Sequence, residues 1–430
     1  MEIIKKIYAD GKADEEFFEL VEKRSGETDK KVTAIVGEII ENVRINGDKA
    51  VKEYTERFDG KLPLYYEVPR EVINDALTEA DSDFTDALLN AIENITDFHT
   101  RQKSQSFVNT KSDGVILGQR VRGLERVAIY VPGGTAAYPS SVLMNAIPAK
   151  IAGVKEIIML TPPLKDGTPN KDILVAAALC GVDRVFMCGG AQAIAAAAYG
   201  TEEIPKADKI VGPGNIFVAT AKKLLYGTVD IDMIAGPSEI LVLADESANP
   251  VFVAADLMSQ AEHDRLASAI LVTTSEKLAD ETIKELARQM ESLSRKDIIA
   301  QSLADYGAII ICSDKDKACE IANRLAPEHL EVLFENPMEY VGRLDNAGSI
   351  FLGSYAPEPL GDYYAGPNHV LPTSGTARFF SPLSVNNFEK RSSFIYYTEN
   401  ALCQAKDDIT LIAQREGLTA HANAIKVRFK

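Results

Sequence analysis

The chain lacks the features that mark several classes of protein. It has five cysteines among 430 residues, an odd total with no C-x-x-C pair, which argues against a disulfide framework. No apolar run approaches the ~20 residues that a membrane-spanning helix needs. The first residues also lack the apolar core of a signal peptide. We therefore expect a soluble cytoplasmic protein with buried, unreactive thiols, although a cysteine nucleophile or a thiolate metal site stays open.

Basic residues are in deficit. Lysine and arginine number 46 against 63 acidic residues, for a net charge of -17, and no dense basic block occurs. Binding to nucleic acid needs a basic face that neutralises phosphates, so we expect no nucleic-acid partner. Hydrophobic residues make up 46% and charged residues 25%, as in globular proteins. A chain of this length exceeds one hydrophobic core, and we expect two main domains.

The order of apolar patterns predicts an α/β fold. After a polar arm, residues from about 29 to 104 have a helical pattern. Short β-branched runs then alternate with helices from Arg126 onward, and the alternation restarts near Glu239. Strands that alternate with helices indicate a parallel sheet. We therefore predict two similar Rossmann-like, doubly wound domains, with small helical segments at both ends of the chain.

The usual dinucleotide fingerprint, G-x-G-x-x-G, is missing, so a standard Rossmann site cannot be assigned. Glycines instead follow three predicted strands, in "YVPGGTAAYP", "MCGGAQAIA" and "IVGPGNIFVAT". Glycine at the carboxyl end of a strand lets backbone amides approach a ligand, and the next helix favours anions. Each loop taken alone is compatible with a tight turn, but three such loops at one sheet edge favour a nucleotide or phosphate cleft.

Only five histidines occur, and four of them stand close to carboxylates or carboxamides. In "LMSQAEHDR", Gln260 and His263 lie three residues apart and so share one helix face. The other three are His329 beside Glu328, His369 near Asp362 and His421 near Glu416. His99 is the exception, and we expect it on a helix surface. These groups predict a metal site, an acid-base pair or both, while a lone histidine is more often a hydrogen-bonded core residue.

Long motifs resemble those of the histidinol dehydrogenases, an NAD- and zinc-dependent family. The resemblance runs from about Arg126 to His421 through "VPGGTAAYPSSVLMNAIPA", "GGAQAIAA", "KIVGPGN", "DIDMIAGPSE", "SQAEH", "APEHLE", "GDYYAGPNHVLPT", "TARFFSPLSV" and "REGLTAHANA". Departures from the family pattern are mild: the pair Tyr363 and Tyr364, and the stretch around Ser374. Neither touches a proposed ligand.

The resemblance implies a complete set of site residues. The zinc ligands it implies are Gln260, His263, Asp362 and His421. The substrate contacts are Ser238, Gln260, His263, Glu328, His329, Asp362, Glu416 and His421. The NAD contacts are Tyr130, Gln192 and Asn215, which all lie at or just after the strand ends where the glycine loops begin. Glutamine is an uncommon zinc ligand beside the usual cysteine, histidine and carboxylate.

The resemblance also implies the reaction: four-electron oxidation of L-histidinol to L-histidine through L-histidinaldehyde, with reduction of two NAD. We assign His329 as the main proton shuttle and Glu328 as the base that activates water. Pro327 ends the preceding helix, so a turn there would let both side chains reach one pocket. The metal would mainly hold the imidazole and amino nitrogens of the substrate. The rival functions are a zinc-dependent hydrolase with Glu328 as base, and a dimeric scaffold without activity.

The domain boundaries expected on this basis combine separate stretches of chain. Residues 1–25 form the arm; 26–129 and 237–378 form the first α/β domain, with the metal and catalytic residues. Residues 130–236 form the second α/β domain with the NAD-binding loops, and 379–430 form a dimerisation tail. The family forms a domain-swapped homodimer, which implies that Glu416 and His421 reach the site of the partner subunit. A tail packed on its own subunit is the alternative.

Overall fold

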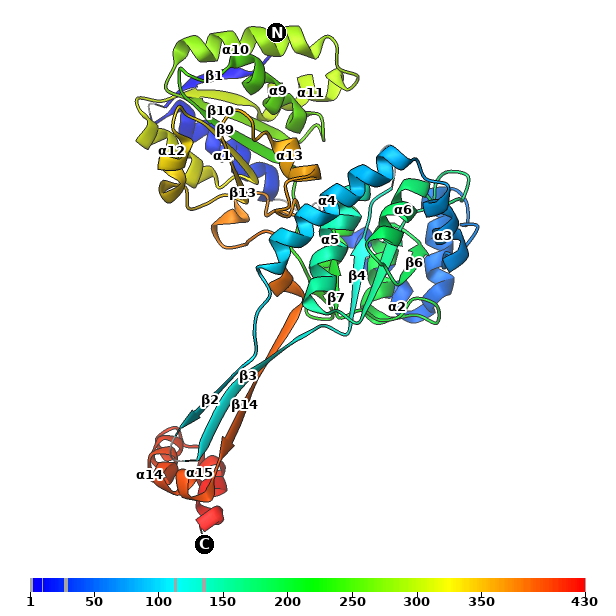
Figure 1. Cartoon of the computed structure of the whole chain (residues 1–430), viewed down its shortest axis with the longest axis vertical. Coiled ribbons are helices and arrows are strands. Elements are labelled where there is room, and N and C mark those ends of the chain that lie inside the picture. Colours follow the sequence, from blue (N-terminus) through cyan, green and yellow to red (C-terminus); the bar gives the residue numbers. More distant parts are fainter. Residues whose placement is uncertain (1–2, 10, 27–29, 112–113, 134–136, 430) are drawn as a thin grey trace. The chain divides into compact units, whose positions relative to one another are not determined.

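The computed structural model describes residues 3–9, 11–26, 30–111, 114–133 and 137–429 (Figure 1). Its contacts divide the chain into two compact units. The first comprises Met1–Gln102 and Leu124–Phe388, and the second comprises Lys103–Gly123 and Glu389–Lys430. No helix in the described ranges is long and apolar enough to cross a membrane.

The first unit contains a five-stranded parallel sheet in the order β6-β5-β4-β7-β8. Its strands are β4 (Arg126–Tyr130), β5 (Glu156–Thr161), β6 (Arg184–Met187), β7 (Lys209–Val211) and β8 (Asp230–Ile231). In the register, Val127 of β4 lies opposite Ile157 of β5 and Lys209 of β7. The chain starts in the middle, moves to one edge and returns to the other, which is the doubly wound arrangement.

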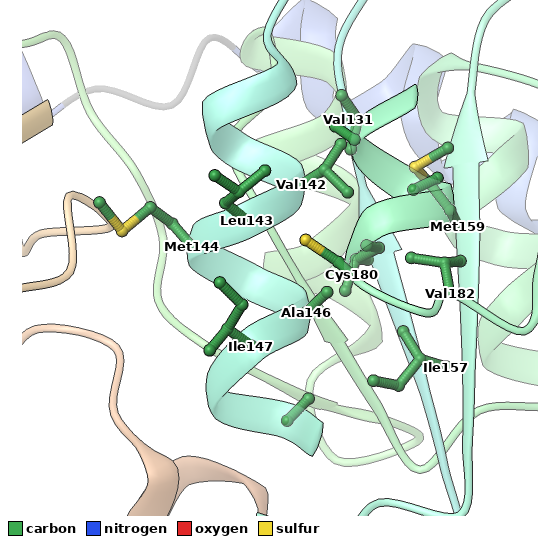
Figure 2. Close-up of a cluster of buried hydrophobic side chains, with 14 of the residues drawn as sticks. Val131, Val142, Leu143, Met144, Ala146, Ile147, Ile157, Met159, Cys180 and Val182 are labelled. Atoms are coloured by element: carbon green, nitrogen blue, oxygen red, sulfur yellow. The ribbon is translucent and has the colours of Figure 1, made fainter. Parts of the chain in front are cut away.

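Helices cover both faces of this sheet because alternate strand residues point to opposite sides. Val127 and Ile129 belong to one apolar cluster and Ala128 and Tyr130 to another. The helices that connect the strands are α5 (Pro139–Ala152), α6 (Lys171–Leu179), α7 (Gly190–Tyr199) and α8 (Ile216–Leu225). Figure 2 shows side chains of α5 packed with residues of the adjoining strands and with Cys180.

Three amino-terminal helices pack against this same sheet layer, and the predicted domain boundary was wrong here. They are α2 (Lys30–Asp59), α3 (Arg70–Thr78) and α4 (Ser82–Thr100). Helix α2 packs on α7 and α8, α3 packs on α6, and α4 packs on α5. The sequence pattern assigns residues 26–129 to the other sheet. The apolar stripe of a helix shows which face is buried, but not which partner buries it.

The first unit also contains a six-stranded parallel sheet in the order β1-β11-β10-β9-β12-β13. Its strands are β1 (Lys5–Tyr8), β9 (Glu239–Ala244), β10 (Ser268–Thr273), β11 (Ala308–Ile311), β12 (His329–Leu333) and β13 (Ser349–Leu352). Without β1, this strand order repeats that of the five-stranded sheet. The predicted pair of similar parallel sheets is therefore confirmed at the level of strand order.

Residues 1–25 are more than a polar arm. Strand β1 pairs with β11 along its whole length, with Lys5 opposite Ala308. Ile4 and, in α1 (Ala13–Gly26), Phe17 and Phe18 are buried. The prediction missed this strand because it is short and carries two lysines.

The remaining helices of this sheet also lie in two layers. They are α9 (Pro250–Ala261), α10 (Glu276–Met290), α11 (Lys296–Tyr306), α12 (Lys315–Leu325) and the short α13 (Glu358–Tyr363). Ile240 and Val242 pack in the apolar cluster that includes α9 to α11, whereas Leu241 and Leu243 pack in the cluster that includes α1 and α12. Helix α9 begins as its sequence predicts: Asn249 is the N-cap, its side chain accepts the amide of Val251, and Pro250 occupies the first turn. Three short 3-10 turns follow these strands: η1 (Pro337–Arg343), η2 (Thr376–Arg378) and η3 (Val385–Phe388).

The second unit is an antiparallel sheet with two helices and a terminal turn. The strand order is β14-β3-β2, from β2 (Phe107–Lys111), β3 (Val115–Gly123) and β14 (Glu389–Tyr397). The helices are α14 (Glu399–Arg415) and α15 (Thr419–Lys426), followed by η4 (Val427–Phe429). The predicted tail, 379–430, is therefore only partly helical, and it shares its sheet with β2 and β3. A pairing between strands so far apart in sequence leaves no local signal.

Candidate functional site

Glu328 and His329 stand at the amino edge of the six-stranded sheet. His329 opens β12 and lies opposite Ile240 of β9 and Ser349 of β13. Helix α9 connects the end of β9 to the start of β10, so its last turn, with Gln260, returns to the same edge. Doubly wound sheets usually bind ligands at the carboxyl edge. This cluster lies at the opposite edge, where the strand pattern gave no signal.

A turn before β12 brings the two predicted catalytic side chains together. Helix α12 ends at Leu325, and Ala326 has a φ of 49° before Pro327. The Glu328 carboxylate accepts a hydrogen bond from the Glu239 amide at 2.9 Å, and His329 Nδ1 lies 3.1 Å from the Glu239 carbonyl oxygen. The separation between His329 Nδ1 and Glu328 Oε2 is 3.6 Å. Both groups thus face the backbone of one residue.

Asp362 on α13 joins this pair. Its Oδ1 lies 3.8 Å from His329 Nε2 and 3.9 Å from His369 Nδ1. The backbone also contributes, since His369 Nδ1 lies 3.0 Å from the carbonyl oxygen of Asp362. On α9, Gln260 Nε2 lies 3.4 Å from His329 Nδ1. His263 Nδ1 lies 3.3 Å from the Gln260 carbonyl oxygen.

Burial and charge shift the pKa values of the site in opposite directions. Burial raises the pKa of Glu328 to about 7, although His329 opposes the shift. Burial lowers the pKa of His329, but the carboxylates of Glu328 and Asp362 outweigh it and raise the value to about 10. Burial also raises the pKa of Asp362, yet the neighbouring imidazoles of His329 and His369 hold it at about 2. A glutamic acid with a near-neutral pKa is suited to general base catalysis.

Further acidic residues, missed at the sequence level, surround this cluster. Glu358 lies one helical turn before Asp362, and its carboxylate accepts a hydrogen bond from Ser259 at 3.2 Å. Burial raises the pKa of Glu358 to about 8 and that of Asp256 to about 6. Glu331 on β12 is fully buried and accepts the amide of Glu358 at 2.7 Å. The i to i+4 spacing of Glu358 and Asp362 was the available signal.

Three atoms of this cluster that could bind a metal are buried and have no hydrogen-bond partner among the described residues: Gln260 Oε1, His329 Nε2 and His369 Nε2. His329, Glu358 and Asp362 also offer ligand atoms within 4.8 Å of one another, and a cavity of about 260 Å³ adjoins His329 and Asp362. Unpaired buried polar atoms are costly. Oxygen and imidazole donors in a buried setting fit a divalent metal such as zinc. Asp362 is common to this group and to the predicted ligand set.

A larger cavity, of about 990 Å³, lies at the carboxyl edge of the five-stranded sheet. Tyr130, Gln192 and Asn215, the predicted NAD contacts, all line it. A buried ion pair between Lys222 and Asp232 holds the loop after β7. Lys222 donates a hydrogen bond to the Gly212 carbonyl, and the Asp232 carboxylate accepts one from the Gly212 amide. Part of the predicted glycine loop, residues 134–136, lies outside the described residues.

The remaining predicted site residues lie on other segments of the chain. Ser238 precedes β9, and its carbonyl accepts the amide of Ser268. Glu416 and His421 belong to the second unit, where both are exposed. The prediction that His99 lies on a helix surface was wrong, because the side chain is fully buried. Its Nδ1 lies 2.7 Å from Gln102 Oε1, and its Nε2 lies 3.4 Å from Asn368 Nδ2.

Comparison with known proteins gives a consistent result. A family model described as histidinol dehydrogenase matches residues 22–429. A protein of Clostridium acetobutylicum named histidinol dehydrogenase is 60% identical over 431 residues, which cover 100% of both chains. One of the same name from Listeria monocytogenes is 58% identical over 400 residues, or 93% of each chain. The crystal structure of histidinol dehydrogenase from Elizabethkingia anophelis superposes with a TM-score of 0.93 at 38% identity, covering 100% of this chain and 98% of that one.

Proposed function

Because the chain belongs to the histidinol dehydrogenase family, and is thus an oxidoreductase that oxidises histidinol in histidine biosynthesis, we propose that it uses NAD and zinc. The full proposal is the oxidation of L-histidinol to L-histidine through L-histidinaldehyde, with two NAD reduced. The observation that carries it is the buried cluster of Glu328, His329 and Asp362. We place the reaction in the cytoplasm.

Zinc would be held by Gln260, His263 and Asp362, together with His421. Its chemical contribution would be to bind the imidazole and amino nitrogens of the substrate and so fix its pose. The unpaired Gln260 Oε1 supports this assignment, since a buried amide oxygen needs a partner. Glu358 and His369 would stand behind these ligands and orient them. His329, held between two carboxylates, is left for proton transfer.

The chain supplies two proton-transfer groups for two oxidations. In the first, His329 takes the proton of the substrate alcohol as the hydride leaves for NAD. This step needs a neutral ring, and zinc bound by Asp362 would lower the pKa of His329 from the value of about 10 that Glu328 and Asp362 give it. The aldehyde must then add water before a second hydride can leave, and Glu328 takes the proton of that water. His329 Nδ1 lies 3.6 Å from Glu328 Oε2, so a small approach of the two side chains or one bridging water would let them exchange a proton as the stages alternate. The remaining substrate contacts would be Ser238, Glu416 and the metal ligands.

NAD would occupy the larger cavity, in contact with Tyr130, Gln192 and Asn215. The side-chain oxygen of Asn215 already accepts the amides of Phe217 and Val218, so it fixes the start of α8. The volume of this cavity is at the upper end of the range for ligand sites.

We also propose that the protein is a domain-swapped homodimer, with Glu416 and His421 of one chain completing the site of the other. Two observations support this: both side chains are exposed, and every residue of β14 after Glu389 is exposed as well. Exposed apolar residues of β14, among them Phe394 and Ile395, are typical of a surface that another chain covers.

Two substitutions separate the metal-binding role from the catalytic role. His329→Asn should lower kcat by about 10²- to 10⁴-fold, the range for a lost acid-base group, with zinc content unchanged. His263→Asn should lose zinc as well as activity. Atomic absorption and NADH absorbance measure the two readouts on the same samples. The assignments fail if both variants keep full zinc and full turnover, or if His329→Asn is the variant that loses the metal.

The rival hydrolase, with Glu328 as base toward water on the metal, makes a different prediction. It requires no nucleotide and produces no change in redox state. An increase in NADH absorbance on addition of L-histidinol and NAD would exclude it, whereas turnover of an ester or amide without NAD would favour it.

A further inference from the structure

Asp59 is a charged group at the larger cavity that the proposed mechanism does not use. It is the last residue of α2 and lines the cavity together with Tyr130, Gln192 and Asn215. Its Oδ2 atom is buried and has no hydrogen-bond partner in the part of the chain that the structure describes. An unpaired buried carboxylate oxygen costs stability. A carboxylate at the carboxyl end of a helix is unfavourable as well, because the helix dipole is negative there.

These costs point to a ligand that the carboxylate binds. Burial raises the pKa of Asp59 to about 6, so at neutral pH the group is mostly ionised and remains an acceptor. The negative charge would repel the phosphates of a dinucleotide. Among the donors of such a ligand, the adenosine ribose carries two hydroxyl groups on neighbouring carbons, which one carboxylate can accept together.

No acidic residue directly follows the second strand of this sheet, where dinucleotide-binding sheets usually carry one that binds the ribose. In doubly wound dinucleotide sites an Asp or Glu follows the second strand and accepts from the ribose. Here β5 ends at Thr161 and is followed by Pro162 and Pro163. Asp166 lines the same cavity, but its carboxylate accepts the amide and the hydroxyl of Thr168, at 2.9 and 2.6 Å. Both bonds fall on Oδ1 of Asp166 and fix that carboxylate on the loop, whereas Asp59 is the acid of this cavity with a buried oxygen that lacks a partner among the described residues.

We propose that Asp59 accepts hydrogen bonds from the adenosine ribose hydroxyls of the dinucleotide and sets the preference for NAD over NADP. This inference rests on the proposed use of NAD. A 2′-phosphate would meet the carboxylate and be repelled, and it would also remove one of the two donors. Lys165, which lines the same cavity, remains to attract a phosphate once the charge of Asp59 is removed.

The test measures nucleotide binding directly. Dissociation constants of NADH and NADPH are obtained from nicotinamide fluorescence for wild type, Asp59→Asn and the matched control Asp166→Asn. For Asp59→Asn the affinity for NADH should fall about tenfold, as for the loss of a hydrogen bond to a charged group. The affinity for NADPH should hold or rise, so the preference for NADH shrinks by at least that factor. Asp166→Asn should keep the wild-type preference.

NADH carries an uncharged nicotinamide ring, so attraction between Asp59 and the oxidised ring does not contribute. A preference unchanged in Asp59→Asn, or an equal loss for both nucleotides, overturns the inference while leaving the proposed use of NAD standing. Wild type that binds neither nucleotide overturns both. If Asp59→Asn does not fold, competition on wild type decides: ADP should displace NADH better than its 2′-phosphorylated counterpart, and equal displacement contradicts the inference.

Discussion

Individual buried residues show where charge and protonation matter most, and His99 is a clear case. The neutral ring satisfies both neighbours: Nδ1–H donates to Gln102 Oε1, and Nε2 faces the amide nitrogen of Asn368. That amide already donates to the Met144 carbonyl at 2.6 Å. A proton on Nε2 would point at another donor. Burial accordingly lowers the pKa of His99, although the hydrogen bond with Gln102 opposes it.

The first prediction concerns pH and stability. The pKa of His99 is lower in the folded chain than the ~6.5 of an unfolded histidine, so below that pH the unfolded chain binds more protons. The stabilising contribution is therefore fully present above pH 6.5 and is lost as the pH falls toward the folded pKa. Urea unfolding of wild type and His99→Gln, at pH 7.5 and 5.5, measures it. The advantage of wild type should shrink at the lower pH; an equal advantage at both would contradict the account.

Single residues also show the limits of sequence reasoning. Gln260, His329 and Asp362 could be chosen from motif resemblance, and the structure places all three within one cluster. Nothing in the sequence marked Glu331 or Asp256, because an acid in a strand or helix pattern is normally assigned to the surface. His99 was assigned to the surface for the same reason. Burial of a polar residue depends on partners distant in sequence, such as Asn368.

At the level of elements, the loop after β7 shows how a glycine fixes a ligand site. Gly212 has a φ of 110°, and a Cβ at this position would lie 2.2 Å from the Tyr130 carbonyl oxygen. The close approach joins this loop to the end of β4, which carries a proposed NAD contact. Gly227 has a similar φ of 99°, but nothing lies within 4 Å of its Cβ position.

The second prediction uses this pair. Gly227→Ala should cost about 1–2 kcal/mol, from left-handed backbone strain alone. Gly212→Ala should cost more, because a backbone atom blocks the new methyl group, and it should also weaken NADH binding. Thermal unfolding and nucleotide fluorescence provide the readouts. Equal losses of stability in the two variants, with NADH binding intact in both, would show that the contact with Tyr130 does not shape the loop.

The alternation of strands and helices was enough to predict two parallel sheets, since each β-branched run is short and bounded by turn residues. It could not assign α2, α3 and α4 to a sheet, because their apolar stripes suit either. It also missed β1 and the pairing of β14 with β3, which join segments more than 250 residues apart. Register and partner choice depend on the whole fold rather than on local pattern.

At the scale of the whole molecule, the proposal requires more than one chain. The ligand set proposed for zinc includes His421, which belongs to the second unit, whereas Gln260, His263 and Asp362 belong to the first. If His421 acts across the dimer, a site is assembled from two chains and defects in different chains can complement each other.

The third prediction is such a complementation. His263→Asn and His421→Asn should each be inactive alone. When the two are unfolded and refolded together, half of the dimers are mixed, and each mixed dimer has one site without a substitution. Activity should therefore return to about a quarter of wild type. Each variant unfolded and refolded alone, at the same total concentration, serves as the control. No recovery in verified mixed dimers would place His421 in the site of its own chain.

The central claim, a four-electron oxidation by one enzyme, is tested most directly by counting product. With L-histidinol limiting and NAD in excess, NADH absorbance at completion gives the number of hydrides transferred per substrate, and amino-acid analysis identifies the product. The account predicts two NADH for each L-histidinol and L-histidine as the sole product. One NADH with accumulated aldehyde, or none, would contradict it.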